Sequence, residues 1–338
     1  MTDHTDVVIV GAGPVGLFAI FELGLLNIKC HVIDNLDKPG GQCAELYPEK
    51  PIFDIPSRTS ITGQELTDNL MRQVKPFHPV FHLNQQVEKV EKLNNSEWVI
   101  STNQGKVIQA KCIVIAAGAG SFVPRKPPLE GIENFEGKTV LYSIKDKSIF
   151  KNKTVLIAGG GDSALDWTNE LSKIAKVNLI HRRKEFRAAP DSVSKMLELE
   201  KNDILSFFTG QLKGISVGSN KSLKVQYQDN DNLHYIEVDY LLPFYGLKME
   251  LGPIVNWGLN LHENKIYVDT EKFETSVSSI FAIGDINTYP GKLKLILSGF
   301  HEAALMAQVC FKYCFPDKKN VFRYTTVSKD LHKKLGFK

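Results

Sequence analysis

Two stretches of the chain share one pattern: a short apolar run, a glycine-rich turn and a longer apolar segment. The first starts at residues 6–10 (DVVIV), continues through GAGPVG and ends near Leu26. The second starts at residues 154–158 (TVLIA), continues through GGGDSA and ends near Lys173. Short runs rich in Val and Ile indicate buried parallel strands, and the longer segments indicate helices. The pattern therefore predicts two strand–turn–helix units of an α/β fold.

The apolar stretch at residues 7–26 is about as long as one membrane span. Gly11, Gly13, Pro14 and Gly16 interrupt it, and its first half is rich in β-branched residues. These features favour a buried strand, a turn and a buried helix over a spanning helix or a signal peptide. We therefore expect no membrane association.

The first glycine-rich turn has the GxGxxG spacing of a dinucleotide-binding loop. Gly11 permits the tight turn, Gly13 lets the backbone approach a pyrophosphate, and Gly16 lets helix and strand pack closely. The helix that begins near Pro14 offers free N–H groups and a positive dipole end to the phosphates. The next apolar strand ends in Asp34, near the distance at which an acid meets a ribose hydroxyl.

The second glycine-rich turn matches GxGxxA through Gly159, Gly161 and Ala164. Asp162 and Ser163 follow at the predicted helix start, and one of them is expected to cap that helix. Together with the two glycines, both are candidate nucleotide-binding residues.

The strand after this second turn, residues 177–180, ends in basic residues where an acid would favour NAD. His181, Arg182 and Arg183 follow it directly, and Arg187 lies further along the same segment, HRRKEFR. Alone, this segment would be interpreted as a solvated basic turn. At the second strand of a dinucleotide unit, its arginines match the 2′-phosphate of NADP, which a guanidinium binds bidentately.

Length and charge narrow the class further. The chain has 338 residues, more than the roughly 250–300 that one hydrophobic core accommodates, so two domains are expected. The formal net charge is only +3, and no basic run is interleaved with aromatics, so nucleic acid is not an expected partner.

Two nucleotide units imply NADPH and FAD, with hydride transfer between nicotinamide and flavin. That step depends on stacking and exclusion of water, so no catalytic acid or base is assigned.

The cysteines do not suggest a disulfide framework. They are Cys30, Cys43, Cys112, Cys310 and Cys314. Their number is odd and no CxxC occurs, which is consistent with a reducing, cytoplasmic compartment. Cys310 and Cys314 share the spacing of one helix face but have no further metal ligands near them in sequence, so no metal site is expected.

Six segments, in this order, make the whole chain resemble the thioredoxin-reductase-like flavoproteins. They are GAGPVG, GGQCAELYP, IVIAAGAGSFVPRK, GGGDSALDW, HRRKEFR and AIGD. Thioredoxin reductases carry a CxxC before the second glycine motif, where this chain has residues 143–146 (SIKD). Enzymes of the glutathione-reductase type would pair Cys43 with a cysteine at the position of Pro48. Neither redox dithiol is present in the sequence.

Without an internal disulfide, a reduced flavin must pass its electrons to an outside acceptor. A flavin takes up a hydride and can release single electrons, which suits an iron–sulfur carrier. The chain accordingly resembles the ferredoxin–NADP⁺ reductases of thioredoxin-reductase-like type. This resemblance implies ferredoxin or flavodoxin as partner and a homodimer. The C-terminal lysines form a basic tail that can attract an acidic ferredoxin, or simply a solvated surface.

The resemblance also implies several flavin-site residues. Tyr47, in the LYP turn, is expected to stack on one flavin face, and Tyr324, in the C-terminal extension, on the other. Asp285, at the end of the strand in SSIFAIGDINTY, is expected to meet the ribityl-phosphate region. Four further positions match residues near the flavin, its adenine or the domain crossover: Gln42, Val87, Phe122 and Thr326.

The predicted fold class is α/β, with two Rossmann-like, three-layer ββα dinucleotide-binding domains. Residues 1–117 and 246–338, the latter including the extension, are expected to form the FAD-binding domain. Residues 118–245 are expected to form an inserted NADPH-binding domain, and the family resemblance implies that the two domains swing. Three alternatives stay open: an NADPH-dependent flavin reductase of a small disulfide or other acceptor, a flavin monooxygenase, and a nucleotide-sensing protein without turnover.

Overall fold

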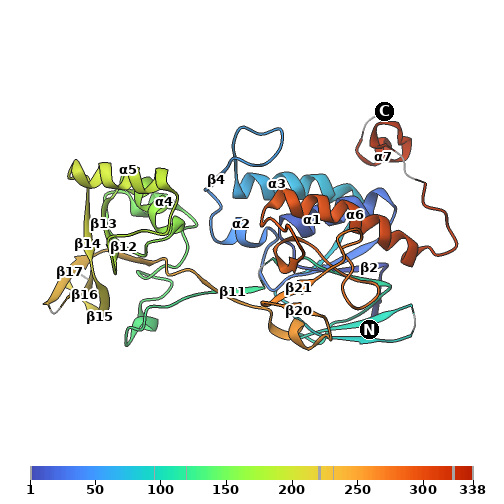
Figure 1. Cartoon of the computed structure of the whole chain (residues 1–338), viewed down its shortest axis with the longest axis horizontal. Helices are drawn as coiled ribbons and strands as arrows, with labels where there is room; N and C mark the ends of the chain where they lie inside the picture. The colour runs from blue at the N-terminus through green and yellow to red at the C-terminus, as the bar shows by residue number, and fades with distance from the viewer. Residues whose placement is uncertain are drawn as a thin grey trace. The chain divides into compact units, whose positions relative to one another are not determined.

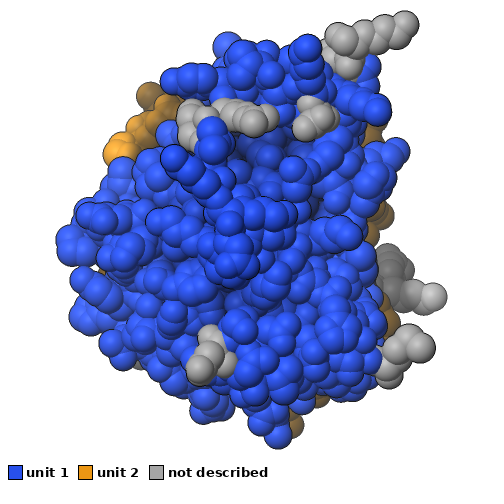
Figure 2. Space-filling view, turned by 90° about the vertical axis from the view of Figure 1, so that its right-hand side faces the viewer, with its two compact units in different colours: residues 1–121, 249–338 blue, residues 122–248 orange. Residues whose placement is uncertain are grey.

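The computed structural model describes residues 2–94, 96–118, 120–219, 222–230, 232–321 and 324–336, without the side chains of residues 121–123, 247–249 and 330. The chain forms two compact units, coloured separately in Figure 2. Unit 1 consists of Met1–Ser121 and Met249–Lys338, and unit 2 consists of Phe122–Lys248. Two segments at the boundary, β11 (Ser121–Pro124) and β19 (Leu247–Glu250), pair with each other.

The centre of unit 1 is a five-stranded parallel sheet. Its strands are, in spatial order, β22 (Ile280–Ala282), β10 (Cys112–Ile115), β2 (Val7–Val10), β3 (Cys30–Ile33) and β6 (Val80–His82). Val7 pairs with Cys30 on one side and with Cys112 on the other. All four residues of β10 are buried, as expected for a strand covered on both faces.

Three long helices cover one face of this sheet. They are α1 (Pro14–Leu25), α3 (Gly63–Val74) and α6 (Ile296–Cys314), and α1 contacts both others (Figure 1). The central helix α1 is apolar because it is enclosed on its sides, whereas α3 is amphipathic. A capping box between Thr62 and Glu65 begins α3. The shorter helices of unit 1 are α2 (Gly41–Glu45), α7 (Lys329–Lys334), η1 (Lys75–Phe77), η5 (Gly252–Asn256), η6 (Gly284–Ile286) and η7 (Thr325–Val327).

A second sheet of unit 1 packs into the same core. Its strands are, in order, β1 (Thr2–His4), β9 (Val107–Ala110), β8 (Trp98–Thr102) and β7 (Val87–Lys92). Along β8, Trp98, Ile100 and Thr102 are buried at alternate positions, which is the pattern of a strand with one face toward the core. Small sheets complete the unit: β4 (Pro51–Ile52) with β5 (Ile61–Thr62), and β20 (Leu261–His262) with β21 (Lys265–Tyr267) and β23 (Asn287–Thr288).

Unit 2 repeats this architecture. Its parallel sheet has the order β14 (Leu205–Thr209), β13 (Lys176–His181), β12 (Thr154–Ala158) and β18 (Tyr240–Pro243). Its helices are α4 (Asp162–Leu171), α5 (Pro190–Lys201), η2 (Ile132–Asn134) and η3 (Lys147–Phe150). Its antiparallel sheet has the order β15 (Gln211–Val217), β16 (Leu223–Asp229) and β17 (Asn232–Val238).

The central strand of unit 2 explains its three layers. Val155 and Ile157 belong to the core that also contains Leu165 of α4. Leu156 and Ala158, which point the other way, belong to the core that contains residues of β16. The sheet thus lies between helices and an antiparallel sheet, and the predicted three-layer fold class is confirmed.

Residues 7–26 form β2 and α1, joined by the glycine turn. Among the described residues, no helix combines the length and apolar character needed to cross a membrane.

Candidate functional site

The first glycine loop joins β2 to α1 in unit 1. Gly11 has a φ of +109°, and a Cβ there would overlap the Ala116 carbonyl. A Cβ on Gly16 would overlap the carbonyl oxygen of Gly11. The protein's own backbone therefore requires both glycines, whether or not a nucleotide is bound.

Gly13 differs from these two glycines. It is the N-cap of α1, with φ −70°, a conformation open to any residue, and Pro14 follows at the first helical position. A Cβ on Gly13 would lie 3.9 Å from its nearest neighbour, the Cα of Gly41. The space in front of this helix N-terminus suits a dinucleotide pyrophosphate. Because of this space, unit 1 fits the FAD that the sequence predicts.

This contrast gives a matched pair of substitutions. Gly13→Ala is expected to weaken FAD binding by about 10- to 100-fold, because overpacking costs about 1–3 kcal/mol, and to lower the unfolding midpoint of the apoprotein only slightly, because Ala is a poorer N-cap than Gly. Gly16→Ala is expected to lower the unfolding midpoint of the apoprotein. FAD titration and circular dichroism measure the two effects. If Gly13→Ala binds FAD as the unchanged protein does, the pyrophosphate does not lie over this loop.

Asp34 lies directly beyond β3 and is 8% exposed. Its Oδ2 accepts a hydrogen bond from Ala12 N at 2.5 Å, and its Oδ1 accepts one from Leu36 N at 2.9 Å. Burial raises the pKa of this carboxyl, and the backbone donors partly offset that shift. A carboxylate accepts up to about four hydrogen bonds, so Asp34 can hold the glycine loop and still accept from a ribose hydroxyl.

The segment from Gly40 to Tyr47 lies against the same loop. Gly40 N donates to Ala12 O at 2.8 Å, and a Cβ on Gly118 would lie 3.7 Å from Nε2 of Gln42. Tyr47 is half-buried, and its hydroxyl is hydrogen-bonded to the Cys43 thiol. The structure therefore brings Gln42 to the end of β10.

The Gly284–Asp285 turn returns to this region from far along the chain. Ile283 N donates to Ile115 O at 2.9 Å, and a Cβ on Gly284 would lie 3.4 Å from the side chain of Val15, in the first turn of α1. The charge of Asp285 contributes to the raised pKa of both Cys43 and Tyr47, mainly a burial effect, so all three are neighbours. Three distant segments thus meet at the N-terminus of α1.

A buried acid that the sequence analysis did not single out supports this turn. Glu302 of α6 is fully buried and accepts from Gly284 N at 2.7 Å. It also accepts from Asn287 Nδ2 at 2.8 Å, from the Tyr289 hydroxyl at 2.9 Å and from Lys292 Nζ. The helical spacing could have indicated that Glu302 is buried. It lies three residues after Gly299 and four before Met306, on the buried face of α6.

Of the four remaining predicted flavin-site residues, one is buried, two are exposed, and one has a side chain outside the described residues. Val87, the first residue of β7, is buried in the core of unit 1. The backbone of Phe122 belongs to β11, but its side chain lies outside the described residues. Tyr324 is 71% exposed and Thr326 is exposed in η7. The helix α7 that follows them reaches Asn27, beyond the C-terminus of α1, through Lys334 Nζ at 2.6 Å. Their roles stay predictions.

The second glycine loop joins β12 to α4 in unit 2. A Cβ on Gly160 would overlap the imidazole of His181, whereas a Cβ on Gly161 would lie 3.7 Å from Arg187 O. Arg187 N donates to Gly160 O at 2.7 Å. The loop and the basic segment are therefore in direct contact, and the open space at Gly161 fits a second pyrophosphate.

The predicted cap of α4 is wrong. Its N-cap is Gly161, with no side-chain hydrogen bond, and neither Asp162 nor Ser163 has that position. Instead, Oδ1 of Asp162 accepts from Ala189 N at 2.8 Å. The carboxylate ties the end of the basic segment to the helix start, which the sequence pattern around the loop could not reveal. Ser163 is exposed in the first turn.

The basic segment presents its cations beside the loop. His181 ends β13, Arg182 and Arg187 are exposed, and Arg183 is half-buried. Among the described residues, neither Nε of Arg183 nor Nε2 of His181 has a hydrogen-bond partner, although both atoms are buried. Burial and the adjacent arginines lower the pKa of His181. The unpartnered Nε–H of Arg183 is a donor beside a glycine loop and suits a phosphate group, so unit 2 fits the NADPH that the sequence predicts.

All five cysteines are free and buried. Burial raises the pKa of Cys43 to about 11, although its hydrogen bond to Tyr47 opposes the shift. A thiol that stays protonated near neutral pH is a poor nucleophile toward a disulfide. The site region therefore holds no activated thiol.

Comparisons with known proteins agree with this architecture. Residues 5–304 match the family described as pyridine nucleotide-disulphide oxidoreductase. The fold is similar to that of the thioredoxin reductase of T. acidophilum, with a TM-score of 0.75 at 24% identity, covering 91% of this chain and 98% of that one.

Two curated relatives are much more similar in sequence. A ferredoxin–NADP reductase of Parvibaculum lavamentivorans is 61% identical over 99% of this chain and 98% of its own length. One of Beijerinckia indica subsp. indica is 57% identical over 98% of both. These matches confirm the resemblance predicted from the six sequence segments. The chain therefore belongs to the pyridine nucleotide-disulphide oxidoreductase family, and within it to the ferredoxin–NADP reductases.

Proposed function

We propose that the protein is an FAD-dependent ferredoxin–NADP⁺ reductase. The observation that carries the proposal is that a chain with two dinucleotide loops has only free, buried cysteines. Electrons therefore have no thiol relay and must leave the flavin for an external acceptor. The names of the relatives identify a ferredoxin as the acceptor class for those proteins, and we extend it to this chain.

In this proposal, unit 1 binds FAD. The N-terminus of α1 receives the pyrophosphate at Gly13, and Asp34 accepts from the adenosine ribose. The Asp285 turn, supported by Glu302, lies where the ribityl chain begins. Tyr47 supplies one stacking ring and Tyr324 the other. These residues bind and orient the cofactor and exclude water, and none of them needs to transfer a proton.

Unit 2 binds NADPH in the same proposal. Gly161 leaves room for the pyrophosphate, and Arg182, Arg183 and Arg187 bind the 2′-phosphate. When bound, FAD would supply the chemistry for hydride uptake from the nicotinamide and for one-electron delivery to the acceptor. Cytoplasmic location, expected from the cysteines, and homodimerisation, implied by the family resemblance, both belong to the proposal.

The basic C-terminal tail is proposed to attract an acidic ferredoxin. Its lysines are Lys318, Lys319, Lys329, Lys333 and Lys334. Raising ionic strength is expected to slow ferredoxin reduction more than reduction of an uncharged dye, because exposed charges are screened within a Debye length of about 8 Å at physiological salt. Equal salt dependence for the two acceptors would remove the tail from the account.

A steady-state comparison of acceptors tests the proposed function. Purified holoprotein with NADPH is assayed with ferredoxin plus cytochrome c, with cytochrome c alone, and with a small disulfide. We expect cytochrome c reduction that depends on ferredoxin and no appreciable disulfide turnover. Disulfide turnover without ferredoxin dependence would favour the alternative of an NADPH-dependent disulfide reductase.

A further inference from the structure

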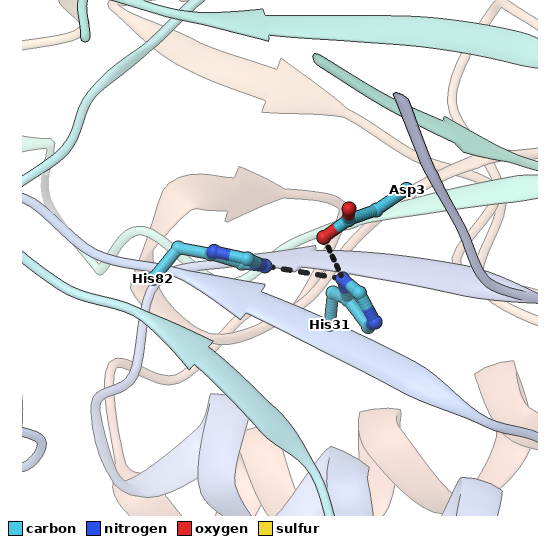
Figure 3. A group of neighbouring side chains, drawn as sticks. All are labelled: Asp3, His31 and His82. Atoms are coloured by element: carbon cyan, nitrogen blue, oxygen red, sulfur yellow. Dashed lines mark hydrogen bonds and ion pairs between the residues drawn. The ribbon is translucent and has the colours of Figure 1, made fainter. Parts of the chain in front are cut away.

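Three polar side chains meet in unit 1 away from the glycine loops. Asp3 lies on β1, His31 on β3 and His82 on β6 (Figure 3). His82 Nε2 is 3.1 Å from His31 Nδ1, and His31 Nδ1 is 4.0 Å from Asp3 Oδ2. One ligand atom from each residue lies within 4.8 Å of the other two. None of the three has a role in the proposed function.

The spacing of these atoms is close to that around a metal ion. Zinc–nitrogen bonds of about 2.0–2.1 Å in a tetrahedron separate the ligand atoms by about 3.3 Å. The separation of 3.1 Å between the two imidazole nitrogens is near that value, and that of 4.0 Å to Asp3 is wider. The Asp3 side chain is 29% exposed, so it has room to rotate toward the ion.

We propose that Asp3, His31 and His82 form a binding site for a divalent transition-metal ion of the Zn²⁺ type. Two imidazoles and one carboxylate are a familiar ligand set for such ions, with one position left for water. The side chain of His31 is 14% exposed, so the site is sheltered but reachable from solvent through Asp3.

The protonation states of the cluster are compatible with this ligand set. Burial lowers the pKa of both His31 and His82, so both rings are neutral near pH 7 and can offer a lone pair. Among the described residues, Lys106 also faces the cluster, and its Nζ lies 2.6 Å from Asp3 Oδ2. Lys106 is therefore a competitor that the ion must displace.

A bound ion would connect the two largest sheets of unit 1. β1 belongs to the sheet with β7, β8 and β9, whereas β3 and β6 are neighbours in the parallel sheet. Asp34, directly beyond β3, donates its N–H to the carbonyl of His82 at 3.0 Å. An ion that binds only the folded state would stabilise unit 1 by mass action. The site is therefore proposed to be structural, and it lies close to the predicted ribose acid.

Metal titration of the holoprotein, without any affinity tag, tests the site. Zn²⁺ affinity is measured by competition with a chromophoric chelator, and Co²⁺ absorption reports the ligand geometry. His31→Gln and His82→Gln are each expected to weaken binding by at least about 100-fold, more than the loss of an outer-shell partner. Lys106→Gln is expected to tighten it by about fivefold, the equivalent of an exposed ion pair. His4→Gln is the control, because His4 is an exposed histidine next to Asp3 on β1.

Each outcome decides the proposal. Stoichiometric binding that both cluster variants abolish and His4→Gln preserves supports it, as does a rise in thermal midpoint with Zn²⁺ that the same two variants lose. No stoichiometric binding, or equal affinity in the unchanged protein and His31→Gln, overturns it. In that case the contacts are a histidine–histidine hydrogen bond beside a lysine–aspartate ion pair. Because flavin reduction by NADPH is measured separately, failure here leaves the proposed function intact.

Discussion

Replacing Arg182 and Arg183 with alanine is expected to raise the KM for NADPH by about 100-fold or more and to change the KM for NADH by no more than about twofold. Hydrogen bonds to charged groups contribute about 1.5–3 kcal/mol each, so two lost phosphate contacts cost about 3–6 kcal/mol. NADH lacks the 2′-phosphate and so cannot lose them. The measurement is initial-rate kinetics with both nucleotides and one artificial acceptor.

A matched control removes the same amount of charge from unit 2 away from the loop. Lys173 lies just beyond the C-terminus of α4, and Lys201 is the last residue of α5. Both lysines are therefore at the helix ends far from the glycine loop, which faces the helix N-termini. Lys173→Ala with Lys201→Ala is expected to leave both KM values unchanged, because surface ion pairs contribute little. Equal losses for NADPH and NADH in the arginine variant would show that HRRKEFR is not the 2′-phosphate site.

Removing the buried carboxylate of Glu302 is expected to destabilise unit 1 by about 3–5 kcal/mol, the usual cost of leaving a buried partner charge uncompensated. In Glu302→Ala, the Lys292 side chain, 6% exposed, loses its counter-charge, and Gly284 N loses its acceptor. Glu302→Gln keeps the shape of the side chain but not its charge. The stability of unit 1 in this variant is therefore expected to lie between that of the unchanged protein and that of Glu302→Ala.

Urea unfolding can report this effect for unit 1 alone. A Trp167→Phe background leaves Trp98 and Trp257 as the only tryptophans of the chain, and both belong to unit 1. Glu271→Ala, the same substitution at an exposed acid of unit 1, is the control. If Glu302→Ala and Glu271→Ala unfold at the same urea concentration, the buried network does not hold the Asp285 turn.

The sequence predicted the elements whose signals are local. The run TVLIA is β12, and the predicted strand after the first helix became β3. Glycine spacing likewise located both loops, because each tight turn depends on a few adjacent residues. The features that the sequence did not predict depend on contacts between distant residues. The carboxylate of Asp162 binds Ala189, and no pattern around the loop indicates that partner.

The two polar clusters of unit 1 show the same limit. His31 and His82 are 51 residues apart and meet only because β3 and β6 pair in parallel, with Ile33 opposite His82. Glu302 could have been predicted more easily from the sequence, because an acid on the apolar face of a helix needs buried partners. Its partners, however, come from the turn after β22, which the helix pattern alone does not reveal.

Anaerobic stopped-flow spectroscopy tests the central claim most directly. The holoprotein is mixed with NADPH and then with an oxidised ferredoxin, while flavin absorbance is followed near its visible maximum. The account predicts rapid bleaching by NADPH and recovery that depends on the concentration of ferredoxin. Bleaching without recovery would contradict the ferredoxin assignment, and no bleaching at all would contradict the pairing of an NADPH unit with an FAD unit.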